Sequence, residues 1–139
     1  MRKRSRAREF ALQILYQVDI TGDKYRESLE NFWKSYSDEE IKEEVKNFSC
    51  ELVEGIANNL AEIDNKISKY AMNWDLKRMA VIDRNILRLG SFELLFRNDI
   101  PPKVSINEAV ELAKKYSSPE ASKFVNGILD KIKLERPNI

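Results

Sequence analysis

Histidine is absent from this chain of 139 residues, and cysteine occurs once, at Cys50. Without histidine the chain lacks the usual general base and the commonest metal ligand. A single cysteine can form neither an intramolecular disulfide nor a zinc cluster, and no GxGxxG or P-loop sequence occurs. Catalysis would have to depend on carboxylates, lysine or tyrosine, and the sequence shows no constellation of these. We therefore expect a protein that is not an enzyme and holds no metal or cofactor.

Long apolar runs are also lacking. The longest unbroken run is Met79 to Ile82, far short of the roughly 20 residues that span a bilayer. The basic start is followed by an apolar stretch over residues 10–20, but glutamine and aspartate interrupt it, so it is a poor signal peptide. Together with the single cysteine, these features predict a cytoplasmic protein.

Proline is missing from the first hundred residues and occurs only at positions 101, 102, 119 and 137. Nothing in those hundred residues therefore breaks a helix sterically. Apolar residues recur at steps of three and four almost everywhere, and the alternation typical of strands is absent. The sequence predicts an all-α fold of about seven helices in a single domain that spans residues 1–139.

The apolar periodicity predicts helices over residues 4–20, 25–34, 82–97, 105–116 and from 118 onward, a long apolar stripe over residues 41–70, and a short turn over residues 75–79. Capping residues mark their ends. The assigned caps are Gly22, Asp75, Ser118 with Pro119 at the first helical position, and the capping boxes Ser37 with Glu40 and Ser105 with Glu108. Gly55 and Gly90 indicate close helix crossings, whereas Gly127 stays open because its neighbours Lys123 and Asn126 are polar.

Positive charge is concentrated at the start of the chain. Five of the 24 basic residues, Arg2, Lys3, Arg4, Arg6 and Arg8, lie among the first eight, and the remainder carries 19 basic against 23 acidic side chains. Guanidinium groups present paired donors that match phosphate oxygens, so the cluster indicates nucleic acid as a partner. Taken alone, it fits a solvated, frayed terminus as well.

Several long strings are more specific. RAREFALQILYQ at residues 6–17, IDRNILRLGSFELLFR at 82–97, DIPPKVSINEAVELAKKY at 99–116 and KFVNGILDKI at 123–132 together resemble the NusB family of bacterial transcription antitermination factors. The match spans essentially the whole chain. The resemblance implies a compact helical protein, built of two packed sub-bundles, that binds the single-stranded boxA element of nascent RNA. It further implies a partner, the small-subunit ribosomal protein NusE, and a role in the RNA polymerase antitermination complex that reads through terminators in rRNA operons.

The resemblance also implies which residues bind. RNA is expected at Lys3, Arg4, Arg6, Arg8, Tyr16, Lys123, Phe124 and Asn126, and NusE at Asp83 and Glu120. Family members include monomers and dimers, and a homodimer that buried the arginine surface would be autoinhibited.

Simpler interpretations stand beside these. Phe124 has the spacing of a core residue, Tyr16 could serve helix packing, Asn126 could bond locally, and Asp83 and Glu120 are favourable near helix N-termini in any case. For Arg84 and Arg88 we expect hydrogen bonds to internal carboxylates or carbonyls in preference to contact with RNA. The alternative function is a helical scaffold that binds a ribosomal or polymerase partner through its acidic face, with little RNA specificity of its own.

Overall fold

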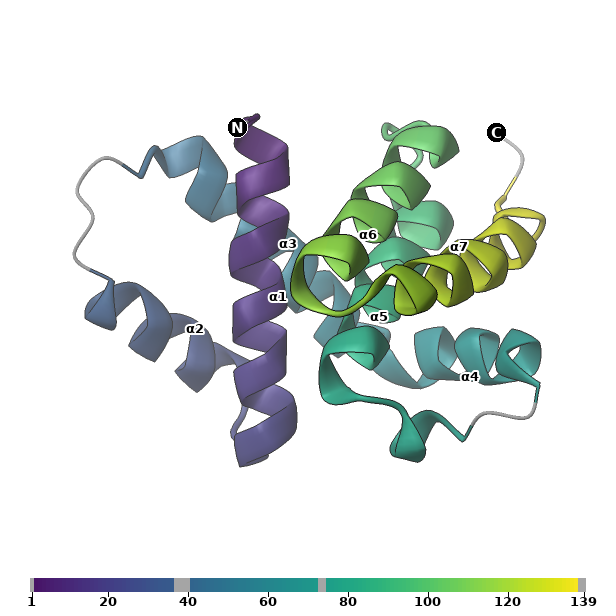
Figure 1. Cartoon of the computed structure of the whole chain (residues 1–139). Helices are drawn as coiled ribbons and strands as arrows, with labels where there is room; N and C mark the ends of the chain where they lie inside the picture. Colours follow the sequence, from purple (N-terminus) through teal and green to yellow (C-terminus); the bar gives the residue numbers. More distant parts are fainter. Residues whose placement is uncertain (1, 37–40, 73–74, 138–139) are drawn as a thin grey trace. The chain divides into compact units, whose positions relative to one another are not determined.

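The computed structural model describes residues 2–36, 41–72 and 75–137. Within these ranges the chain forms seven α-helices, one short 3-10 turn and no strand, which confirms the predicted all-α fold. It divides into two compact units, residues 1–58 and residues 59–139 (Figure 1). The expectation of a single domain stays a prediction. Among the described helices, none combines the length and apolar character needed to span a membrane.

The first unit consists of α1 (Lys3–Thr21), α2 (Tyr25–Ser35) and α3 (Glu43–Asn58), and α1 packs against both other helices (Figure 1). Aromatic rings form its core between α1 and α2, where Phe10 meets Phe32 edge to face at 5.9 Å between ring centroids. The Ser49 hydroxyl of α3 donates to the Ala7 carbonyl of α1 at 2.8 Å. These contacts fix the N-terminal helix against its neighbours.

The second unit consists of α4 (Leu60–Ala71), the 3-10 turn η1 (Leu76–Arg78), α5 (Val81–Phe96), α6 (Pro102–Tyr116) and α7 (Pro119–Lys133). The predicted central helix is α5, which packs against α4, α6 and α7. Ile86, Leu87 and Leu94 on α5 are fully buried, because apolar residues occupy nearly every side of this helix.

Local capping chemistry explains three of the helix ends. Gly22 ends α1 in the left-handed region with φ 74°, which glycine adopts without steric cost. The Ser118 hydroxyl accepts from the Ala121 amide at 3.0 Å, with Pro119 in the first helical turn of α7, as predicted. Asp75 accepts from the Lys77 amide at 3.0 Å and caps η1, also as predicted.

The structure changes one expectation about helix boundaries, and another falls on residues that it does not describe. The apolar stripe over residues 41–70 forms two helices, because α3 ends at Asn58 and α4 begins at Leu60, and asparagine is a weak helix former. The first proposed capping box, Ser37 with Glu40, lies outside the described residues.

The second capping box, Ser105 with Glu108, is wrong. The helix begins earlier, at Pro102, because proline fits the first helical turn, where its missing N–H is not needed. Ser105 is buried inside α6, and its hydroxyl donates to the buried Glu93 carboxylate at 2.9 Å. A tertiary partner, and not a helix end, accounts for this serine.

Candidate nucleic-acid and partner interface

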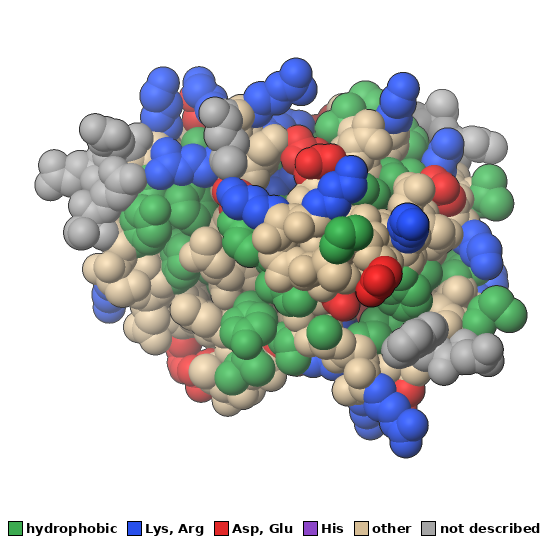
Figure 2. All heavy atoms as spheres, in the orientation of Figure 1, with side chains coloured by type: hydrophobic (Ala, Val, Ile, Leu, Met, Phe, Trp, Pro, Cys, Tyr) green, Lys and Arg blue, Asp and Glu red, His purple; other side chains and the backbone are tan. Residues whose placement is uncertain are grey.

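The basic residues of the N-terminus lie along the first turns of α1. Figure 2 shows Lys and Arg side chains gathered where the N-terminal end of α1 lies in Figure 1. Lys3 and Arg4 line a hollow of about 220 Å³ together with Asn47 and Phe48 of α3. The Arg4 guanidinium lies over the Phe48 ring, 4.5 Å from its centroid, which orients the cation at the surface.

Carboxylates of α3 share this hollow. Lys3 forms an ion pair with Glu44, and the hydrogen bond from Lys3 lowers the pKa of Glu44. More than half of each of these two side chains is exposed, so the pair stabilises the fold little. A phosphate that binds Lys3 must therefore compete with a carboxylate already in place.

Arg8 differs from the other basic residues of this cluster. Its side chain is buried, with 2% of the residue exposed, and its guanidinium lies over Phe48 at 5.4 Å from the ring centroid. Arg6 is half-buried, with its guanidinium 5.3 Å from the Phe10 centroid. On α1, Lys3 and Arg4 are thus exposed to a ligand and Arg6 is partly exposed. The buried Arg8 side chain does not reach a ligand at the surface.

Tyr16, further along α1, is 42% exposed. Its ring is available to stack on an unpaired base. The simple interpretation as a packed aromatic accounts for only part of its surface.

The predicted residues of the second unit gather on α7 and around it. Lys123 and Asn126 are exposed, whereas Phe124 is half-buried. Phe124 lines a pocket of about 360 Å³ with Asp83 of α5 and Glu120 of α7. The structure therefore brings both predicted partner residues and one predicted RNA residue to the same cavity.

This acidic pocket contains an unusual polar atom. Oδ1 of Asp83 is buried and has no hydrogen-bond partner. A buried carboxylate oxygen without a partner is costly. Met79, Ala80 and Ala121 add apolar surface beside the two carboxylates, and Arg78 contributes one positive charge to the lining.

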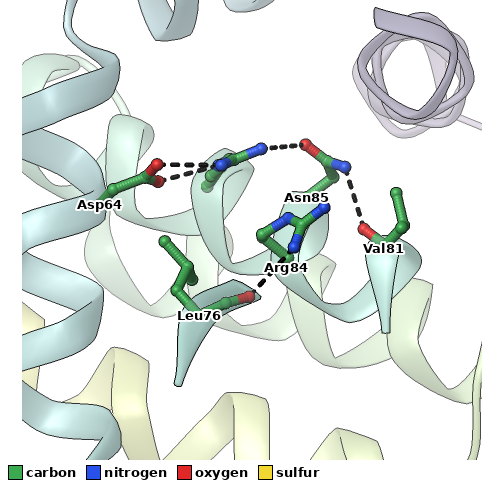
Figure 3. A network of polar contacts seen from close by, with 6 residues as sticks. Asp64, Leu76, Val81, Arg84 and Asn85 are labelled. Atoms are coloured by element: carbon green, nitrogen blue, oxygen red, sulfur yellow. Dashed lines mark hydrogen bonds and ion pairs between the residues drawn. The ribbon is translucent and has the colours of Figure 1, made fainter. Parts of the chain in front are cut away.

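Arg84 and Arg88 serve the interior of the second unit, as predicted (Figure 3). Arg88 binds the Asp64 carboxylate through two hydrogen bonds, from Nε at 2.8 Å and from Nη2 at 2.9 Å, and its Nη1 donates to Asn85 at 3.1 Å. The Nη1 atom of Arg84 donates to the Leu76 carbonyl at 3.0 Å. This network ties α4 and η1 to α5 and leaves these arginines a structural role.

Sequence reasoning missed most of the other residues that line the acidic pocket. Met79 and Ala80 lie ahead of α5, and Ser118 and Ala121 lie at the start of α7. No short-range pattern connects two segments about forty residues apart, so only the packing of α5 against α7 brings them together.

Comparisons with known proteins show the family of this chain. The NusB family model matches residues 5–133. The chain belongs to the NusB family. A transcription antitermination protein NusB of Anaeromyxobacter dehalogenans is 49% identical over 130 residues, which cover 94% of this chain and 89% of the relative. Family membership makes this chain a transcription antitermination factor, a regulatory protein and not an enzyme.

Solved NusB structures share the fold. NusB of T. maritima matches with a TM-score of 0.87 and 40% identity, over 97% of this chain and 93% of that one. A crystal structure of the antitermination factors NusB and NusE in complex with dsRNA matches with a TM-score of 0.86 and 31% identity, over 97% of this chain and 98% of that one.

Proposed function

We propose that this NusB family member binds the single-stranded boxA element of nascent RNA together with NusE, within the RNA polymerase antitermination complex, and supports read-through of rRNA operons. The observation that carries the proposal is that the first unit carries a basic surface and the second unit an acidic one. Lys3 and Arg4 form a basic face on α1, and Asp83 and Glu120 form an acidic pocket in the second unit. A related NusB structure contains both NusE and RNA. Because the proposed role is in transcription of these operons, we expect the protein to act in the cytoplasm.

The basic face supplies affinity and register. Lys3, Arg4 and Arg6 neutralise phosphates and release counterions, which is independent of sequence. Tyr16 and Phe124 offer rings on which unpaired bases stack, worth on the order of 1–3 kcal/mol each. Lys123 and Asn126 are exposed polar groups that can read base edges.

The acidic pocket suits a basic protein partner such as NusE. The unpartnered oxygen of Asp83 would accept a hydrogen bond from an entering lysine, arginine or amide donor. The apolar lining would cover the aliphatic stem of such a side chain, and Glu120 adds a second negative charge at the pocket. The occupant proposed for this pocket is therefore a protein side chain and not RNA.

Two variants with separate effects test this division. Replacing Arg4 and Arg6 by alanine should weaken binding to boxA RNA and flatten its salt dependence while NusE binding is retained. Replacing Asp83 by asparagine should weaken NusE binding, measured by calorimetry, while binding of RNA by the free chain is retained. If each variant lost both ligands equally and stayed folded by circular dichroism, the separate surfaces would be wrong.

The helical scaffold is the competing account. It predicts tight NusE binding with equal affinity for boxA and scrambled RNA, even in the complex. Sedimentation of the free chain belongs to the same experiment, because a homodimer that covers the basic face would lower RNA affinity as the protein concentration rises.

A further inference from the structure

No packing contact within the described protein explains why position 127 is a glycine. It lies in the middle of α7, is exposed, and a Cβ added there would meet no atom within 4 Å. Gly90 of α5 is different, because a Cβ there would lie 2.6 Å from Cδ1 of Leu129. Glycine is disfavoured inside helices, and it allows another molecule to approach the backbone closely. The packing of the second unit therefore opposes a side chain at position 90 but not at position 127.

Gly127 lines a groove of about 310 Å³ between the end of α4 and the face of α7. Met72, at the α4 side of the groove, is 77% exposed. Phe124 and Ile128 add apolar surface from α7. The groove thus combines an exposed methionine, a half-exposed aromatic ring and an unhindered stretch of helix backbone.

The charge of the groove is the opposite of that of the acidic pocket. Its described lining includes Lys123 and Lys131 and no carboxylate, whereas the lining of the acidic pocket includes Asp83 and Glu120. Phe124 lines both cavities. Phe124 is therefore shared by a pocket with two carboxylates and a groove with two lysines.

One wall of the groove is held firmly. The Tyr70 hydroxyl donates to Glu135, which also accepts from Lys66 at 2.6 Å and from Lys69 at 3.3 Å. Hydrogen bonds from Lys66 and Tyr70 lower the pKa of Glu135 to about 2, so this carboxylate is ionised and its charge is offset by two lysines. Tyr70 is thereby fixed in place before any ligand arrives.

We propose that this groove seats one unpaired nucleotide of the bound RNA, with its base against Phe124 and Met72, its phosphates beside Lys123 and Lys131, and its backbone passing over Gly127. The inference rests on the proposed RNA-binding function and assigns Met72, Gly127 and Lys131 to it. Lysine rims with an aromatic ring between them are the usual elements of single-strand binding, and the bare helix backbone at Gly127 admits the sugar–phosphate chain.

The decisive variant is Gly127→Ala, measured by fluorescence anisotropy with labelled single-stranded boxA RNA. The added methyl meets nothing inside the protein, so the midpoint of urea unfolding should stay equal or rise. It would intrude on a strand lying against α7, and the Kd should rise at least about fivefold, the lower end for overpacking a close contact. Loss of RNA affinity without loss of stability is the expected signature.

Two lysine variants of α7 serve as a test and its matched control. Lys131→Gln should weaken RNA binding and reduce the slope of log K against log salt by about 0.7. Lys133→Gln removes the same charge two residues further along α7, outside the groove lining, and should change neither quantity beyond half of that effect. Equal effects of the two lysine variants would reduce the groove to general electrostatic attraction and overturn the proposal.

Other outcomes separate this inference from the proposed function. If the wild-type chain binds boxA RNA and the Arg4 and Arg6 variants weaken it, but Gly127→Ala and Lys131→Gln do not, the groove is wrong and the function stands. If the groove variants weaken NusE binding and leave RNA binding intact, the groove is a protein interface and the proposal is overturned. If the wild-type chain binds no RNA, both fail together.

Discussion

The two helix-interior glycines of the second unit make a matched test of its packing. Replacing either by alanine removes the same helix penalty, about 1 kcal/mol. At Gly127 nothing opposes this gain, because the added Cβ meets no atom within 4 Å. At Gly90 the Cβ would lie 2.6 Å and 3.1 Å from the two terminal carbons of Leu129 and 3.4 Å from the Ala109 Cβ.

Leu129 is fully buried and cannot swing into solvent to relieve the clash. Overpacking of this kind costs typically about 1–3 kcal/mol. The helix-propensity gain is common to both variants, so the free energies of unfolding of Gly127→Ala and Gly90→Ala should differ by about 1–3 kcal/mol. Gly127→Ala should be the more stable of the two and more stable than the wild type.

Urea unfolding followed by circular dichroism measures this difference. With m values of about 1–3 kcal/mol per molar urea, the two midpoints should differ by on the order of 1 M. Both substitutions lie in the same unit, so the same transition reports both. Equal midpoints, or a higher midpoint for Gly90→Ala, would refute the packing of α5 against α7 described above.

Three further predictions follow from buried and paired charges. Arg8→Ala should lower the unfolding midpoint of the first unit and leave the salt slope of RNA binding unchanged, because this guanidinium is buried over Phe48; a reduced slope would place it in the RNA site. Asp64→Ala should cost about 2–3 kcal/mol in urea unfolding, because it leaves a largely buried guanidinium without its carboxylate, whereas Asp99→Ala at a 53% exposed carboxylate should cost less than about 1 kcal/mol. Glu135 has a pKa lowered from 4.5 to about 2, so its stabilising effect is complete above pH 4.5 and is lost as the pH falls from 4.5 toward 2. The difference in unfolding midpoint between the wild type and Glu135→Gln should therefore shrink as the pH falls across that window. A difference that stays constant would contradict the pairing.

Local chemistry made much of the fold predictable. Gly22 and Ser118 mark helix ends because their effects act within one turn of the chain, and the apolar periodicity of α5 marks it as central. Ser105 misled the prediction because its partner, Glu93, lies on another helix. A capping motif and a buried tertiary hydrogen bond use the same residue types, so spacing alone does not separate them.

The sequence predicts which charged residues belong to the site, but not which of them are buried or what lines the pocket. Charge alone places Lys3, Arg4 and Arg8 in one cluster, yet only packing against Phe48 buries Arg8. The pocket around Asp83 requires segments from two helices, and sequence shows neither its apolar lining nor the unpartnered carboxylate oxygen. The sequence leaves Gly127 open because Lys123 and Asn126 are polar, and only the structure shows that no packing contact requires a glycine there.

The most direct test of the proposed function is the ratio of affinities for boxA and scrambled single-stranded RNA, titrated with and without NusE at two salt concentrations. Three or four phosphate contacts, as offered by Lys3, Arg4, Arg6 and Lys123, predict a salt slope of roughly −2 to −3. The affinity ratio should exceed one for the free chain and increase when NusE is bound. A ratio of one in the presence of NusE, with NusE binding intact, would contradict sequence-selective RNA recognition and favour the scaffold.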